Sequence, residues 1–99
     1  MRRGTTPTLT FTLPFEADMI TACNIAFVQS KRLVLEKELA DCEVDGQTLR
    51  VTLTEKDTLR FNACDSVEIQ LRVGIGESRL ASNIIRIHVF SILKDGVLE

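Results

Sequence analysis

One stretch in the second half of the chain constrains the fold more than any other, because it alternates strictly. The odd positions of residues 67–75 are all apolar, and the even positions are charged, polar or glycine. Successive side chains of a β-strand point to opposite faces, so this pattern predicts a strand with one dry face and one wet face. Burying five such side chains, at about 1.5–3 kcal/mol each, stabilises a fold by at most roughly 10 kcal/mol. We therefore expect this strand at the centre of a sheet.

Shorter stretches with the same period predict further strands. Residues 8–13 alternate threonine with Leu9, Phe11 and Leu13, and two prolines bracket them, as at the ends of a strand. Further strands are expected at residues 19–29, at 33–39 with Leu33, Leu35 and Leu39 facing inward, at 42–44, at 48–53 and at 80–93. The last of these is expected to carry a bulge near Ser82 and Asn83.

Turn and cap signals divide these strands. Asp45-Gly46 predicts a hairpin with a type I′ turn, and polar turns are expected at residues 15–18, 29–32 and 76–79. Thr54 followed three residues later by Asp57 resembles a capping box and predicts a short helical turn near residues 55–59. Six or seven short strands with regular turns favour one antiparallel β-sandwich over residues 1–99, with a small barrel as the alternative. Residues 1–6 and 95–99 are expected to be flexible.

Composition narrows the class of protein. Apolar residues make up 44% of the chain and charged residues 26%, as in an ordinary globular domain. The net charge of −2 and the lack of a basic stripe argue against binding to nucleic acid. No apolar run is long enough to span a membrane, so we expect a cytoplasmic protein.

The residues that carry chemistry are few and scattered. Three cysteines, at positions 23, 42 and 64, have no metal-binding spacing, and we expect free thiols. His88 is the only histidine and lies mid-strand without a nucleophile beside it. The glycine-rich residues 74–79 lack the third glycine of a dinucleotide fingerprint and the helix after it, and the acidic residues 41–46 lack the distal glutamate of a calcium loop. We expect no enzyme activity, no cofactor and no metal.

The last strand has an unusual second apolar face. Ile84, Phe90 and Ile92 are expected to lie opposite Ile85, Ile87 and Val89, with Arg86 and His88 between them. A sheet face that meets water is usually polar, so this second face needs a cover. The cover is either the crossover at residues 54–61 or a second subunit in a homodimer. Alternatively, a bulge near Asn83 shifts the parity of the strand. The candidate interface residues are Ile84, Arg86, His88, Phe90 and Ile92.

Three segments carry a resemblance to a known group of proteins. They are residues 2–11 (RRGTTPTLTF), 57–61 (DTLRF) and 92–97 (ILKDGV). They resemble small proteins carried by prophages and mobile elements of low-GC Gram-positive bacteria. The expected strand order is similar to the immunoglobulin-like N-terminal domain of phage baseplate upper proteins. The resemblance implies an immunoglobulin-like sandwich of about seven strands and names no catalytic or binding residue.

These observations predict a non-enzymatic structural or assembly module of a phage or prophage that acts by protein–protein interaction. Its partners would be phage structural proteins or a second copy of itself, either in the host cytoplasm or in the virion. The alternative is a small ligand-binding module, for instance for cell-wall glycan. The absence of Trp and Tyr counts against that alternative, because sugar sites favour flat aromatic faces.

Overall fold

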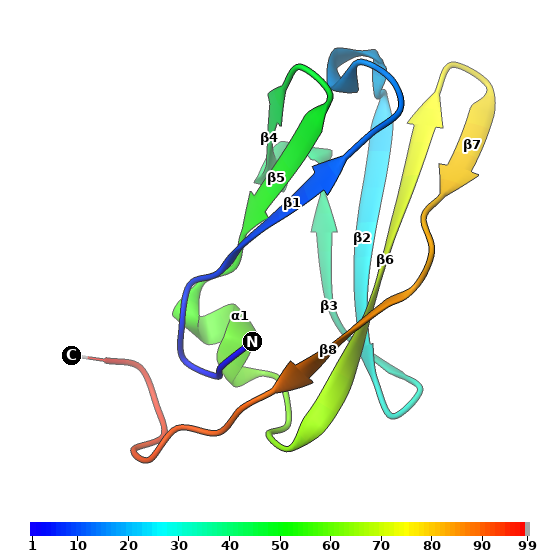
Figure 1. Ribbon diagram of the computed structural model, residues 1–99. Coiled ribbons are helices and arrows are strands. Elements are labelled where there is room, and N and C mark those ends of the chain that lie inside the picture. The colour runs from blue at the N-terminus through cyan, green and yellow to red at the C-terminus, as the bar shows by residue number, and fades with distance from the viewer. Residues whose placement is uncertain (99) are drawn as a thin grey trace.

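The alternating stretch is the central strand of the larger of two sheets. The computed structural model describes residues 1–98 as an antiparallel β-sandwich (Figure 1). Strand β6 (Asp65–Ile75) pairs along one edge with β2 (Ala22–Gln29), which pairs with β3 (Arg32–Glu38). Along its other edge, β6 pairs with β7 (Ser78–Ala81) and then with β8 (Ile85–Val89). The prediction of a central strand is therefore confirmed.

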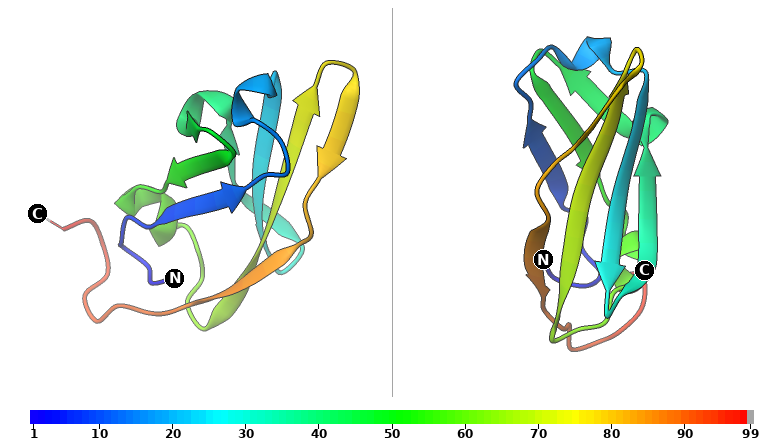
Figure 2. Two further views of the ribbon diagram at one scale, coloured as in Figure 1. Left: turned by 45° about the horizontal axis from the view of Figure 1, so that its top comes forward. Right: turned by 90° about the vertical axis from the view of Figure 1, so that its right-hand side faces the viewer.

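The smaller sheet has three strands in the order β1-β5-β4. They are β1 (Thr8–Thr12), β4 (Cys42–Asp45) and β5 (Thr48–Thr52), and the sheet lies across the larger one as a second layer (Figure 2). An immunoglobulin domain of the constant type has two sheets, one of three strands and one of four strands in the order ABED, and the four-stranded sheet is the one to compare with β1-β5-β4. The order β1-β5-β4 has one strand fewer, so the immunoglobulin-like identity stays a prediction.

The core lies between the two sheets and is closed at one end by a short helix. Helix α1 (Glu55–Leu59) begins after Thr54, which caps it with Asp57 as the sequence predicted. Just beyond α1, Phe61 is 1% exposed and its ring lies 5.9 Å from the ring of Phe27. The inward residues of the central strand are buried from Val67 to Val73, and Ile75 is half-buried. The predicted inward face is therefore confirmed.

One inward assignment is wrong, and a bulge is the reason. Phe27 pairs with Leu35, but the next residue, Val28, pairs with Leu33, so Val34 is an extra residue in β3. An extra residue in a strand reverses the face to which each earlier side chain of that strand points. Leu35 is buried as expected, whereas Leu33 turns to the outer face and is 55% exposed.

The predicted strand at residues 80–93 is two strands along one edge of β6. Arg72 pairs with Ala81 and Ile69 pairs with Ile85, so two residues of β6 oppose three residues of the neighbouring strand. The extra residue lies in 82–84, where the bulge was expected. There the backbone N–H of Ser82 donates to the carbonyl oxygen of Leu71 (2.8 Å), and the Ser82 hydroxyl accepts from the backbone N–H of Leu71 (3.0 Å).

Several boundaries also differ from the prediction. A short 3₁₀ helix at Ala17–Met19 replaces part of the expected turn at 15–18. A second one at Leu39–Asp41 replaces the last residue of the expected strand at 33–39. Of the two residues between Asp45 and Thr48, only Gly46 has a positive φ, at 57°. That pattern belongs to a type II′ turn and not to the expected type I′ turn. The type I′ pattern occurs instead at Ser30 and Lys31, whose φ angles are 49° and 63°.

The N-terminal segment, expected to be flexible, makes specific hydrogen bonds. Arg2 forms a parallel bridge with Phe90, and the backbone N–H of Arg3 donates to the carbonyl oxygen of Phe90 (3.0 Å). The Arg3 guanidinium also donates to the carbonyl oxygens of Phe61 (2.8 Å) and Leu59 (3.0 Å) and pairs with Asp95. These bonds tie the first three residues to the end of β8 and to α1. Of the other predicted flexible end, residue 99 lies outside the described residues.

Candidate protein-binding face

Four of the five predicted interface residues lie on one outer face, two of them in β8 (Arg86 and His88) and two flanking it (Ile84 and Phe90). Arg86 and His88 lie opposite Glu68 and Ser66 of β6, and the Arg86 guanidinium pairs with the Glu68 carboxylate at 3.2 Å. Ile84 lies on the same outer face and is 52% exposed, while its neighbour Ile85 faces the core side. Ile84 and Ile85 therefore lie on opposite faces, as the sequence predicted.

Phe90 is covered in part by the N-terminal segment, which sequence reasoning did not anticipate. Its ring meets the His88 ring edge to face, with 4.6 Å between ring centres, and the Arg2 guanidinium lies 5.3 Å above it. A guanidinium at that distance is held by the negative face of the ring. Phe90 nevertheless remains 48% exposed, so one Arg side chain covers only part of the ring.

Ile92 does not join the other four residues. It lies beyond the end of β8 and is half-buried, and its side chain lies against Gly4. A β-carbon added to Gly4 would come within 3.0 Å of the Ile92 side chain, so the two segments are in close contact. The cover expected for Ile92 is thus partly supplied by the chain itself, through the N-terminal segment near α1.

The outer face of the neighbouring strands adds apolar residues beside Ile84. Ile84 lines a shallow hollow together with Ala26 and Val28 of β2, and Val28 pairs with the outward-turned Leu33. Both bulges of the larger sheet therefore leave an apolar side chain, Leu33 or Ile84, on this face. The following residues of this outer face are together called the outer patch: Val28, Leu33, Ile84, Arg86, His88 and Phe90. The sequence gives no sign that Leu33 points outward, because Leu33 and Leu35 have the same parity and both are apolar.

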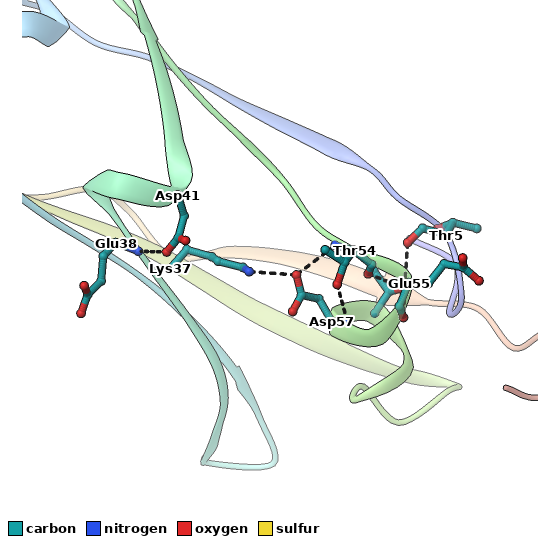
Figure 3. A network of polar contacts seen from close by, with 8 residues as sticks. Thr5, Lys37, Glu38, Asp41, Thr54, Glu55 and Asp57 are labelled. Carbon is teal, nitrogen blue, oxygen red and sulfur yellow. Dashed lines mark hydrogen bonds and ion pairs between the residues drawn. The ribbon is translucent and has the colours of Figure 1, made fainter. Parts of the chain in front are cut away.

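At the end of the sandwich that α1 closes, polar contacts tie this helix to β3, the edge strand of the larger sheet (Figure 3). Thr54 and Asp57 exchange the two hydrogen bonds of a capping box, at 2.9 and 3.1 Å. The Lys37 ammonium of β3 reaches the Asp57 carboxylate at 2.9 Å, and both side chains are at least four-fifths buried. Partial burial favours the neutral acid, but the hydrogen bonds from Thr54 and the charge of Lys37 outweigh it and lower the pKa of Asp57 below 3.8. Asp57 therefore holds α1 against the larger sheet as a carboxylate.

The three cysteines are free thiols in the structure. Cys23 of β2 and Cys42 of β4 lie side by side between the sheets, where the Cys42 thiol donates to the carbonyl oxygen of Glu38 (3.3 Å). Burial raises the pKa of Cys23 to about 12 and also raises the pKa of Cys42. Both thiols are therefore protonated at neutral pH and behave as small core residues. Their proximity across the sheets was not predicted, because the spacing of cysteines in a sequence does not reveal it.

Residues 1–98 contain no group of three or more His, Cys, Asp or Glu side chains arranged to hold a metal ion. Within the same residues, every helix is too short or too polar to cross a membrane. Comparisons of the chain with protein-family models, with curated proteins and with solved structures found no match.

Proposed function

We propose that this chain is a non-enzymatic structural or assembly module of a phage or prophage that works by binding another protein. The observation that carries the proposal is the outer patch, where apolar side chains are exposed on a sheet face that ordinarily meets water. The phage setting, with action in the host cytoplasm or in the virion, is supported by the sequence resemblance alone.

The chemistry of the outer patch suits a protein partner. Interface cores are enriched in aromatic residues and arginine, and their rims are polar. Phe90 and Ile84 supply exposed apolar surface about Arg86 and His88, and Arg86 is already held by Glu68. An arginine held in place loses less conformational freedom on binding than a free one. A glycan site is less well supported, because Phe90 is the one phenyl ring of the patch and the His88 ring packs against it.

The test is binding to the products of the neighbouring genes, measured one protein at a time by calorimetry. Phe90→Glu and Ile84→Glu place a charge in the middle of an apolar contact, and we expect each to weaken the complex at least tenfold, about 1.4 kcal/mol. Lys56→Glu, on the exposed face of α1, is the control and should leave the affinity unchanged. A complex that tolerates both patch substitutions contradicts the proposal, as does binding of cell-wall glycan that both substitutions abolish.

A further inference from the structure

The outer edge of β1 carries backbone groups without a strand to pair with. Within residues 1–98, β1 pairs with β5 alone. The backbone groups of odd-numbered residues are directed at β5, as the bonds flanking β1 show: the Leu13 N–H donates to the Gln47 carbonyl oxygen (2.8 Å), and the Pro7 carbonyl oxygen accepts from the Leu53 N–H (2.9 Å). Bonded and non-bonded pairs alternate along an antiparallel ladder. The even residues of β1 therefore direct their backbone N–H and carbonyl groups away from β5. These residues are Thr8, Thr10 and Thr12.

An apolar groove of about 460 Å³ runs beside this edge. One wall is the stretch from Thr10 to Phe15, and the other wall is formed by β6, β7 and β8. Leu80 and Ile85 lie on the core side of the larger sheet, opposite the buried Val73 and Ile69, yet they are 47% and 46% exposed. They remain exposed because the smaller sheet ends at β1 and does not extend over them. None of the twelve residues that line the groove is charged.

The other three sheet edges of the described chain have features that discourage pairing with another strand. Edge strands are commonly protected by charges, bulges or shortness. β3 carries charged residues and a register shift, β4 is four residues long and contains Glu43 and Asp45, and the β7–β8 edge is interrupted by its bulge. β1 has neither a charge nor a bulge, and its five residues pair with β5 in unbroken register. β1 is thus the edge that is open to a further strand.

The sequence of β1 is chemically self-complementary. Thr-Leu-Thr-Phe-Thr reads as polar and apolar residues in the same order from either end. In an antiparallel pair centred on Thr10, that residue lies opposite itself, Leu9 lies opposite Phe11, and Thr8 lies opposite Thr12. Threonine–threonine pairs are favourable across antiparallel strands, and the Leu9–Phe11 pair brings apolar surface together. No like charges meet, because the strand has none, and Pro14 lacks the N–H that would extend the ladder.

We propose that two copies of this chain associate through β1, joining their three-stranded sheets edge to edge about a two-fold axis at Thr10. Such an interface is isologous, since each copy contributes the same surface. The second copy also brings its sheet beside the groove, which gives Leu80 and Ile85 the cover that they lack. A five-residue strand pair buries less than the roughly 1,200 Å² of a stable complex, so the dimer is weak and depends on concentration.

The experiment is sedimentation equilibrium of the full chain at rising concentration. The wild type is expected to shift from monomer to dimer. Thr10→Lys and Thr10→Glu each place like charges opposite one another across the axis and should weaken the dimer at least tenfold. Because Thr10 faces itself, an equimolar mixture of the two variants should restore association, which also shows that both are folded.

Two controls separate this interface from the outer patch. Gln47→Lys adds the same charge to the hairpin of the same sheet, and Phe90→Glu alters the outer patch; both should dimerise like the wild type. A wild type that stays monomeric to about 1 mM, or a dimer that tolerates Thr10→Lys, would overturn the proposal. So would a mixture of the Thr10→Lys and Thr10→Glu variants that does not associate, or a dimer that is lost in Phe90→Glu. The first three of these results leave the binding of a different protein through the outer patch untouched, whereas a dimer lost in Phe90→Glu would make the outer patch the self-interface.

Discussion

The two long sides of this sandwich differ in how they are closed. On one side, the 3₁₀ helix Leu39–Asp41 passes from β3 to β4, and the buried Lys37–Asp57 ion pair holds α1 against the larger sheet (Figure 3). On the other side, β1 and the β7–β8 edge leave the apolar groove between them. The closed side is held by side chains of this chain alone. The open side exposes core-facing residues and an unpaired strand edge.

This difference separates stability from association. Contacts on the closed side are made within the chain, so changes there should alter the unfolding free energy and leave self-association unchanged. At the rim of the open side, β1 offers hydrogen bonds that the folded chain does not use. Changes on that edge should alter association with little cost in stability. The wall of the groove that β6 contributes is an exception, because its residues Leu71 and Val73 belong to the core.

The largest expected effect concerns that wall. Leu71 is 4% exposed and lies in the wall of the groove contributed by β6. Leu71→Ala should lower the unfolding free energy by about 2–5 kcal/mol through the lost contacts and the cavity left behind. Arg72→Ala, one residue further on the exposed face, should cost under about 0.5 kcal/mol. Equal losses in chemical denaturation would show that the inward face of β6 is misassigned.

Gln70 is a poorer control than its outward position in the sequence indicates. Its side-chain amide donates to the carbonyl oxygen of Ser82 at 3.0 Å, so it helps to hold the bulge between β7 and β8. Truncating it would therefore remove a hydrogen bond as well as a surface side chain.

A smaller effect is expected on the closed side. Thr54→Ala removes the hydroxyl that accepts from the Asp57 backbone N–H and should cost about 1 kcal/mol. Thr12→Ala, on the exposed face of β1, should change stability by less than about 0.5 kcal/mol. Thermal unfolding of both variants would decide the matter, and equal midpoints would mean that the cap does not stabilise α1.

The pH dependence of the closed side follows from Asp57. Its folded pKa is lowered, so the stability it contributes is complete above the unfolded pKa of about 3.9 and is lost as the pH falls through the folded value. The difference in unfolding free energy between the wild type and Asp57→Asn should therefore be constant from about pH 7 to pH 5 and shrink below about pH 4. A difference that grows on acidification would mean that folding raises the pKa of Asp57 and does not lower it.

The smallest expected effect is a difference in thiol reactivity. Cys64 is exposed, whereas burial raises the pKa values of Cys23 and Cys42, which lie between the sheets. The thiolate is the form that reacts with a thiol reagent, so at pH 8 Cys64 should react first. Cys23 and Cys42 should react as fast as Cys64 only after the protein is unfolded. Electrospray mass spectrometry of the native protein should match three free thiols. A mass lower by two hydrogens would mean that two of the thiols are oxidised.

Much of the sandwich is predictable from the sequence because its signals are local. Alternation places β6, β1 and β5, and the Thr54–Asp57 spacing places α1. The bulge at Val34 is not predictable, because Leu33 and Leu35 are both apolar and only the cross-strand register shows which one turns outward. All five predicted interface residues have the same strand parity, but only four share a face, because the chain leaves the strand after Phe90 and Ile92 packs against Gly4 instead.

Other features depend on contacts between distant segments. Arg2 on Phe90 and Arg3 on Phe61 join the first residues to positions far along the chain, and a basic pair at a terminus carries no signal for either contact. The groove arises from the unequal widths of the two sheets, and no local pattern reports sheet width. The open edge of β1 is likewise a property of strand order, although its lack of charge is visible in the sequence.

The most direct test of the contrast between the two sides is the concentration dependence of amide hydrogen exchange, followed by NMR. In dilute protein, Leu13 should be protected by its bond to β5, whereas Thr8, Thr10 and Thr12 should exchange rapidly from the open edge. With rising concentration, protection should appear at these three threonines as the second copy pairs with β1. Threonine amides that exchange equally fast at every concentration, or protection that appears along β7 and β8 instead, would contradict the account.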